Sequence, residues 1–159
     1  MQINQEIIQK IYALYDECLT SLEPFHRKLD LMIIPTKLSQ KIIDATGIDT
    51  TGYWICIDNF GILHALEEHG NPISEAKRGQ IAVDKDDFAR MIEVCLKPDE
   101  IMVVGTSRHT QKPLLQFKKM IDNKIYVVKE VRSVTSQKKR KVNRLVFHTM
   151  YKIRAAKLS

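Results

Sequence analysis

The sequence is short of cysteine and lacks any long apolar run. Its three cysteines, Cys18, Cys56 and Cys95, are odd in number and widely spaced. We therefore expect no disulfide framework, and predict that each thiol packs as a small hydrophobic group in a reducing compartment. No apolar stretch reaches the roughly 18 residues of a membrane span, and the N-terminus has no signal-peptide core. A cytoplasmic chain with no membrane partner is predicted.

The spacings typical of metal sites are also missing. There is no Cys-x-x-Cys pair, and no two histidines lie four residues apart. A set made from Cys56, Cys95, His64 and His69 would contain neither pair. The sequence therefore predicts no metal site.

Acidic residues are scarce in the last third of the chain. Residues 107–159 hold 2 Asp and Glu against 15 Lys and Arg, a net charge of +13. Residues 1–106 hold 17 against 10, a net charge of −7, so the whole chain carries +6. A basic segment of this size indicates an acidic partner, most often nucleic acid, although a solvated basic surface is the alternative.

The helical signals lie in the first two thirds of the chain. With 159 residues, 44% hydrophobic and 28% charged, the chain has the size and composition of one globular domain. Apolar residues recur at steps of three and four, and Pro24, Gly47, Gly70 and Pro98 mark helix ends. Asp84, Asp86 and Asp87 favour a helix start there. The predicted helices span about 3–22, 36–47, 61–69 and 85–96, with a β-prone segment at 52–58.

After residue 100 the apolar period changes from near four to two. Asp122-Asn123 is typical of a tight hairpin turn. The predicted strands are 101–106, 114–121, 124–132 and 143–151. We predict one α+β domain over 1–159, in which a helical N-terminal scaffold, 1–48, packs on a four-stranded antiparallel meander within a core of 50–155. A basic tip, 136–141, joins the last two strands.

Two histidines five residues apart, His64 and His69, are the clearest candidates for chemistry. About 140° separates them around a helix, so they do not share a face as the histidines of a zinc-protease helix do. They converge if His69 lies where the helix ends at Gly70. Two imidazoles beside a cationic sheet make an acid/base pair. The alternatives are a structural helix histidine for His64 and a partner of the helix dipole for His69.

The last two strands supply polar candidates. Strand alternation predicts that Leu145, Phe147, Thr149 and Tyr151 share one face, and that Val146, His148 and Met150 share the other. Thr149 and Tyr151 could reach a phosphate or a base, although β-propensity explains both equally well. Lys129 interrupts an apolar strand face, so it either extends to the rim or faces a phosphate.

The helical N-terminal half, the His-x4-His-Gly segment, the antiparallel sheet and the late Thr-x-Tyr together resemble the barnase/EndoU/colicin/RelE-like nuclease superfamily. The resemblance covers residues 50–155 and is strongest to versions carried by phages and mobile elements. It implies metal-independent RNA cleavage without a cofactor, in which the 2′-hydroxyl attacks phosphorus to leave a 2′,3′-cyclic phosphate. EndoU-like members commonly separate their two histidines more widely, so one of this pair could be structural.

The resemblance also implies roles for single residues. His64 and His69 match the paired histidines that exchange protons, and Thr149 and Tyr151 match the residues that position phosphate and base. Lys129 is the expected cation, with Arg132 and Arg108 as substitutes. The residues expected to bind nucleic acid are Arg108, Lys112, Arg132, Lys138, Lys139, Arg140, Lys141 and Arg144.

RNA is the predicted partner, and a toxin of this kind would also have an immunity protein or antitoxin. Two other functions fit the same sequence. A nucleic-acid-binding module without catalysis needs only the basic surface and no histidines. A mobile-element accessory protein would instead contact its partner through the acidic helical half. The oligomeric state does not follow from the sequence.

Overall fold

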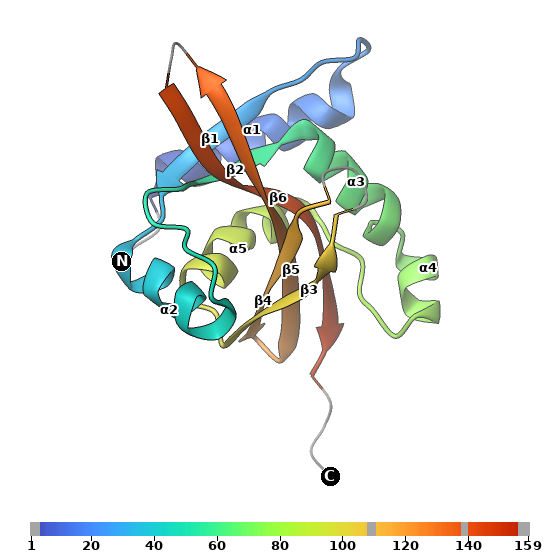
Figure 1. Ribbon diagram of the computed structural model, residues 1–159. Coiled ribbons are helices and arrows are strands. Elements are labelled where there is room, and N and C mark those ends of the chain that lie inside the picture. Colours follow the sequence, from blue (N-terminus) through green and yellow to red (C-terminus); the bar gives the residue numbers. More distant parts are fainter. Residues whose placement is uncertain (1–3, 108–110, 138–139, 156–159) are drawn as a thin grey trace.

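The fold is a single six-stranded sheet with helices packed against it (Figure 1). The computed structural model describes residues 4–107, 111–137 and 140–155, and the side chains among these outside 131–140. The helices are α1 (Gln5–Thr20), α2 (Thr36–Thr46), α3 (Asn59–His69), α4 (Pro72–Lys77) and α5 (Lys85–Leu96). The strands are β1 (Lys28–Ile33), β2 (Trp54–Asp58), β3 (Glu100–Thr106), β4 (Pro113–Ile121), β5 (Lys124–Gln137) and β6 (Arg140–Arg154).

The α+β class is confirmed, and β3 to β6 form the predicted antiparallel meander. The prediction of only four strands was wrong. The strand order is β1-β2-β6-β5-β4-β3, and β2 runs parallel to β6, so the sheet is mixed. The β2–β6 pairing joins Trp54 to Arg144 and Cys56 to Val146. Each segment has its own local strand signal, but no local signal indicates that the two segments pair with each other.

Local signals set the helix ends. The Asn4 side chain accepts a hydrogen bond from the Glu6 N–H at the start of α1. Gly47, with φ of 75°, ends α2 in the left-handed conformation that glycine adopts without strain. Asp84 and Asp87 form a reciprocal capping box at α5. The sequence analysis missed α4, because Asn71-Pro72 ends one helical stretch and also starts the next.

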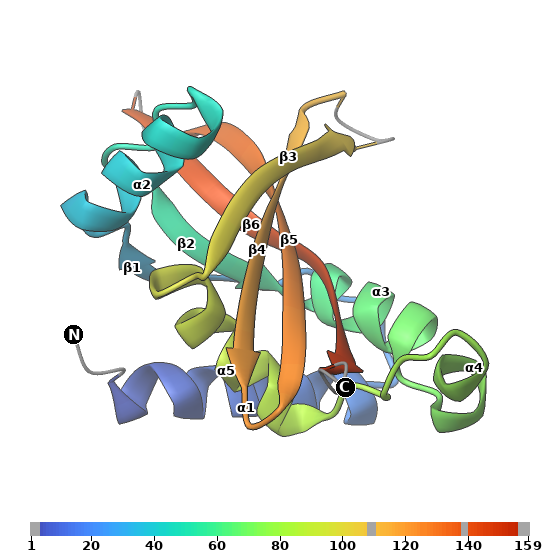
Figure 2. The same cartoon turned by 90° about the horizontal axis from the view of Figure 1, so that it is seen from below.

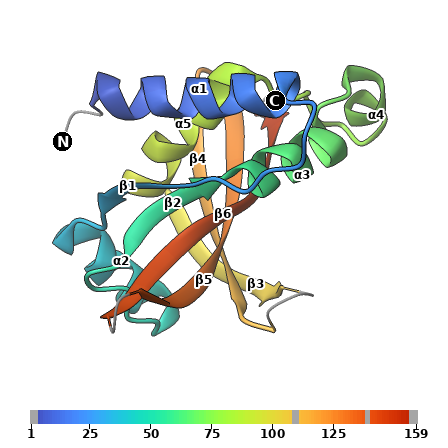
Figure 3. The ribbon, with the colours of Figure 1, turned by 90° about the horizontal axis from the view of Figure 1, so that it is seen from above.

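Helices α1 and α5 lie side by side on one face of the sheet (Figures 2 and 3). The core between α5 and the sheet includes Phe88, Phe117 and Phe147, whose side chains are almost fully buried. Helix α3 begins directly after β2 and lies beside β6, which it contacts more than any other element. This position brings the histidine segment to the last strand.

A bulge in β6 changes the predicted strand faces. Glu130 lies opposite Phe147, but the neighbouring Lys129 lies opposite Thr149, so β6 contains one extra residue, His148. Phe147 and Met150 therefore both belong to the core on the α5 side. The side chains of Thr149 and Lys129 lie on the other face of the sheet from Phe147. The strict alternation predicted for residues 145–151 was wrong, because it assumed a regular strand.

Candidate active site

Two adjoining cavities lie between α3 and β6, and both are lined by His64 and His148. The larger has a volume of about 400 Å³ and is rich in polar groups. Helix α3 forms one wall, β5 and β6 contribute a second, and the ends of β3 and β4 contribute a third. Its lining residues are His64, Glu68, Thr106, Ser107, Leu114, Lys129, His148 and Thr149. We call it the polar cavity.

The two predicted histidines meet at one carboxylate. His64 Nε2 lies 3.1 Å from Glu68 Oε1, and His69 Nε2 lies 3.5 Å from Glu68 Oε2. His69 is the last residue of α3, where the following Gly70 ends the helix. The side chains therefore converge, although their spacing keeps them off a common helical face. Glu68 escaped the sequence analysis, but its position four residues after His64 could have pointed to it.

His69 is held more tightly than His64. Its side chain is buried, and Nδ1 lies 3.1 Å from Oε2 of Glu75, which is fully buried. The His69 ring also packs against Tyr151, with 5.5 Å between ring centroids. By contrast, the His64 side chain is 41% exposed and lines both cavities. Glu68, Glu75 and Tyr151 thus fix the His69 ring behind the polar cavity.

His148 is a candidate that the sequence analysis did not find. Its ring lies 5.3 Å from the His64 ring, measured between centroids, at an interplanar angle of 49°. Strand alternation had placed His148 with Val146, and both residues line the smaller cavity. The β-bulge changes the face of Thr149, which joins His148 in the polar cavity, and it could not be predicted because it depends on the pairing of β5 with β6.

Lys129, Thr149 and Tyr151 lie near one another, but only Lys129 and Thr149 line the polar cavity. Lys129 lies opposite Thr149, and Lys129 Nζ is 5.9 Å from the centre of the Tyr151 ring. Burial raises the pKa of the Tyr151 hydroxyl. The hydroxyl oxygen of Thr149 is buried and has no hydrogen-bond partner among the described residues. Buried polar groups are nearly always satisfied, so this oxygen is a candidate ligand contact.

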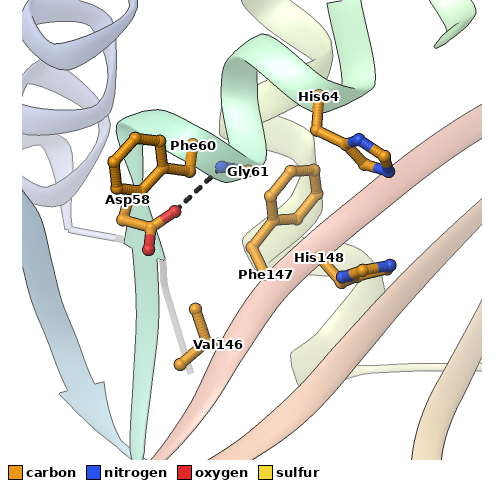
Figure 4. Close-up of a pocket in the computed structure, with 7 residues that line it drawn as sticks. All are labelled: Asp58, Phe60, Gly61, His64, Val146, Phe147 and His148. Atoms are coloured by element: carbon orange, nitrogen blue, oxygen red, sulfur yellow. Dashed lines mark hydrogen bonds between the residues drawn. The ribbon is translucent and has the colours of Figure 1, made fainter. Parts of the chain in front are cut away.

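A glycine allows α3 to approach β6 closely enough to form the histidine pair. A Cβ atom at Gly61 would lie 2.6 Å from the backbone oxygen of Phe147 and 2.8 Å from its ring. Asp58 starts the helix by accepting a hydrogen bond of 2.8 Å from the Gly61 N–H (Figure 4). Any larger residue at position 61 would push α3 away from β6, and His64 away from His148.

The residues predicted to bind nucleic acid are spread beyond the cavities. Arg144 is mostly buried and forms two hydrogen bonds with Asp30, of 2.7 and 3.0 Å, which help to lower the Asp30 pKa. Its role is therefore at least partly structural. Lys112 is half-buried, whereas Lys141 is exposed. Arg108, Lys138 and Lys139 lie outside the described residues, as do the side chains of Arg132 and Arg140.

Within residues 4–107, 111–137 and 140–155, no three His, Cys, Asp or Glu side chains gather as a set of metal ligands. Among the described helices, none has the length and apolar character needed to cross a membrane.

One comparison with known proteins gives a match. The family model described as phage-Barnase-EndoU-ColicinE5/D-RelE like nuclease 3 matches residues 33–159. No curated protein and no solved structure gives a significant match. The matched region is most of the chain, and it contains α3, β5 and β6, which carry the histidine pair and Lys129. The chain belongs to the phage-Barnase-EndoU-ColicinE5/D-RelE like nuclease 3 family.

Proposed function

We propose that this nuclease cleaves RNA by attack of a 2′-hydroxyl on the adjacent phosphorus, leaving a 2′,3′-cyclic phosphate and a 5′-hydroxyl. The observation that carries the proposal is the pairing of His64 with His148 at the polar cavity, which also contains Lys129. The reaction needs a base, an acid and a cation beside the developing charge. These three side chains are of the required types.

One imidazole, in its neutral form, removes the proton from the 2′-hydroxyl. The other, protonated, donates to the departing 5′-oxygen, and the two reset by exchanging protons with water. Glu68 is in hydrogen-bond reach of His64 and orients that ring. His69 acts as a positioning residue, since it contacts Glu68 but does not line either cavity. The proposed pair is thus His64 and His148, in place of His64 and His69.

Lys129 and Thr149 bind the phosphate in this proposal. The ammonium group of Lys129 stabilises the negative charge that builds up on the non-bridging oxygens. The Thr149 hydroxyl, which lacks a partner among the described residues, donates a hydrogen bond to one of them. RNA is favoured over DNA because the internal nucleophile is the 2′-hydroxyl, which DNA lacks.

The test is digestion of total RNA by the purified protein in EDTA, followed by analysis of the product ends. His64→Ala and His148→Ala should each slow cleavage by about 10²- to 10⁴-fold. His69→Ala should cost less, and Glu67→Ala, on the exposed side of α3, should cost nothing. Intact RNA at high protein concentration, or products with 5′-phosphate ends, would contradict the proposal.

The same experiment separates cleavage from simple binding. A nucleic-acid-binding module would retain RNA with steep salt dependence, leave it uncut, and tolerate alanine at both His64 and His148.

A further inference from the structure

We infer that the smaller cavity beside the histidine pair binds a nucleobase of the strand whose phosphate occupies the polar cavity. This inference rests on the proposed function and adds a second subsite to it. The smaller cavity has a volume of about 330 Å³. Figure 4 shows the side chains that line it. Its lining residues are Asp58, Phe60, Gly61, His64, Val146, Phe147 and His148. We call it the apolar cavity.

The apolar cavity has an exposed aromatic edge. Phe60 is 57% exposed, although a phenylalanine side chain normally gains by burial. The His26 ring lies 4.8 Å from the Phe60 ring, measured between centroids, at an interplanar angle of 34°. His26 comes from the segment between α1 and β1, so two distant parts of the chain build this edge. Flat exposed rings are the platforms on which single-stranded bases stack.

Charge decides which part of a nucleotide each cavity accepts. Asp58 lines the apolar cavity, and its carboxylate would repel a phosphate there. Lys129 lines the polar cavity, where it attracts one. The two cavities share His64 and His148, so a base in one and a phosphate in the other place the ribose beside both imidazoles. A nucleotide combines an apolar ring with a charged phosphate, which matches this division.

The first experiment measures stacking without cleavage. The probe is a short RNA with 2′-O-methyl groups throughout, which cannot react, and with fluorescent 2-aminopurine at one position. Binding to the wild type should quench the 2-aminopurine fluorescence. Phe60→Ala and Phe60→Leu should weaken binding by about 5- to 100-fold and reduce the quenching. Phe60→Trp should retain both, and Leu63→Ala, an exposed apolar residue of α3 outside the apolar cavity, should match the wild type.

The second experiment uses cleavable RNA of the same sequence with the base removed at one nucleotide. If Phe60 stacks on that base, removing the base and truncating Phe60 remove the same interaction. The fold-loss in kcat/KM from both changes together should then be smaller than the product of the two separate fold-losses. The base subsite would be overturned, with cleavage retained, by two results together. Base removal and Phe60→Ala would have independent effects on kcat/KM at every nucleotide tested, and Phe60→Ala would leave the fluorescence quenching unchanged. Quenching that depends on Phe60 without any cleavage would instead overturn the proposed reaction and keep the subsite. RNA that neither binds nor is cut would overturn both.

Discussion

At the scale of single residues, two threonines each bury a hydroxyl group that has no hydrogen-bond partner among the described residues, and only one of them lines a cavity. The hydroxyl oxygens of Thr149 and Thr50 are both buried without a hydrogen-bond partner among the described residues. Thr149 lines the polar cavity, whereas Thr50 precedes β2 and does not line either cavity. A buried hydroxyl without a partner costs free energy in the folded protein, and of the two only Thr149 lines a cavity in which a ligand or a water molecule can supply the partner.

We predict that Thr149→Val lowers cleavage by about tenfold or more while leaving the free energy of unfolding equal or raised by about 1 kcal/mol. Valine keeps the shape and removes the polar atom that burial penalises. Thr50→Val is the matched control and should change stability in the same direction without affecting cleavage. Urea unfolding and a cleavage assay on both variants provide the measurements. Equal activity in the two variants would remove Thr149 from the site.

Glu130 gives a second residue-scale prediction, in this case about pH. It is fully buried between β5 and α5, and it accepts a hydrogen bond of 3.0 Å from the Cys95 thiol. Burial raises the Glu130 pKa to about 8. The carboxyl has a pKa of about 4.3 in the unfolded chain, so between these two values the folded state holds a proton that the unfolded state has released. Stability must therefore fall as pH rises across this interval.

We expect the free energy of unfolding of the wild type to fall, relative to Glu130→Gln, by up to about 1.4 kcal/mol for each pH unit between pH 5 and pH 8. Glutamine keeps the size of the side chain but has no proton to release. Urea unfolding of both proteins at several pH values measures the free energy of unfolding of each. The other carboxyls contribute equally to both proteins, so their contributions cancel in the difference. Parallel curves would mean that Glu130 titrates normally.

At the scale of elements, the site depends on the direction in which α3 runs after it begins at the end of β2. The β2–β6 pairing stops at Cys56 and Val146, and Asp58 then starts the helix that runs along the rest of β6. Gly61 is the closest point of this contact. The position of α3 relative to β6 therefore sets the separation of His64 and His148.

Gly61→Ala should destabilise the fold by about 1–3 kcal/mol, because the added methyl group meets a backbone oxygen that cannot move aside easily. Cleavage should fall further than the loss of folded protein explains, since His64 moves away from His148. Glu67→Ala, an exposed position of the same helix, is the control. Thermal unfolding and cleavage at a temperature where the variant is folded test this prediction, and wild-type activity at that temperature would contradict it.

The sequence predicted most elements, because each has a local signal. Helical periodicity and caps indicated α1, α2 and α5, and period-two segments indicated β3 to β6. The β-prone segment at 52–58 indicated β2 but not its place in the sheet, and β1 was not predicted. Both strands join the sheet through distant partners, and the apolar run of β1 is too short to distinguish a strand from a loop. The bulge that brings Thr149 beside His148 depends on the β5–β6 register.

At the scale of the whole molecule, the acidic and basic parts of the chain are joined by ion pairs. Lys152 of β6 lies 2.7 Å from Asp87 of α5, and both side chains are buried. Arg144 of β6 binds Asp30 of β1. Some of the basic charge thus stabilises the fold, and charge that serves in this way is not available to RNA. The basic tip at 136–141 includes the last paired residues of the β5–β6 ladder, in which Ser136 lies opposite Lys141 and Gln137 lies opposite Arg140.

We predict that replacing four basic residues of the tip by glutamine weakens RNA binding and reduces its salt dependence. These residues are Lys138, Lys139, Arg140 and Lys141. Each phosphate contact on a single strand contributes about −0.7 to the slope of log K against log salt, so losing four contacts lowers the slope by up to about 3. A control with the same change in net charge replaces Lys10, Lys37, Lys41 and Lys77, which are exposed in the acidic part.

Filter binding of 2′-O-methyl RNA at several salt concentrations measures both slopes without cleavage. If RNA contacts the tip directly, the slope of log K against log salt should become smaller in the tip variant and stay unchanged in the control. Equal losses in the two variants would show that only the net charge of the molecule matters, as expected for a solvated basic surface. In a cleavage assay the tip variant should raise KM and keep kcat, because the tip replacements leave His64, His148 and Lys129 unchanged and remove only binding that substrate and transition state share.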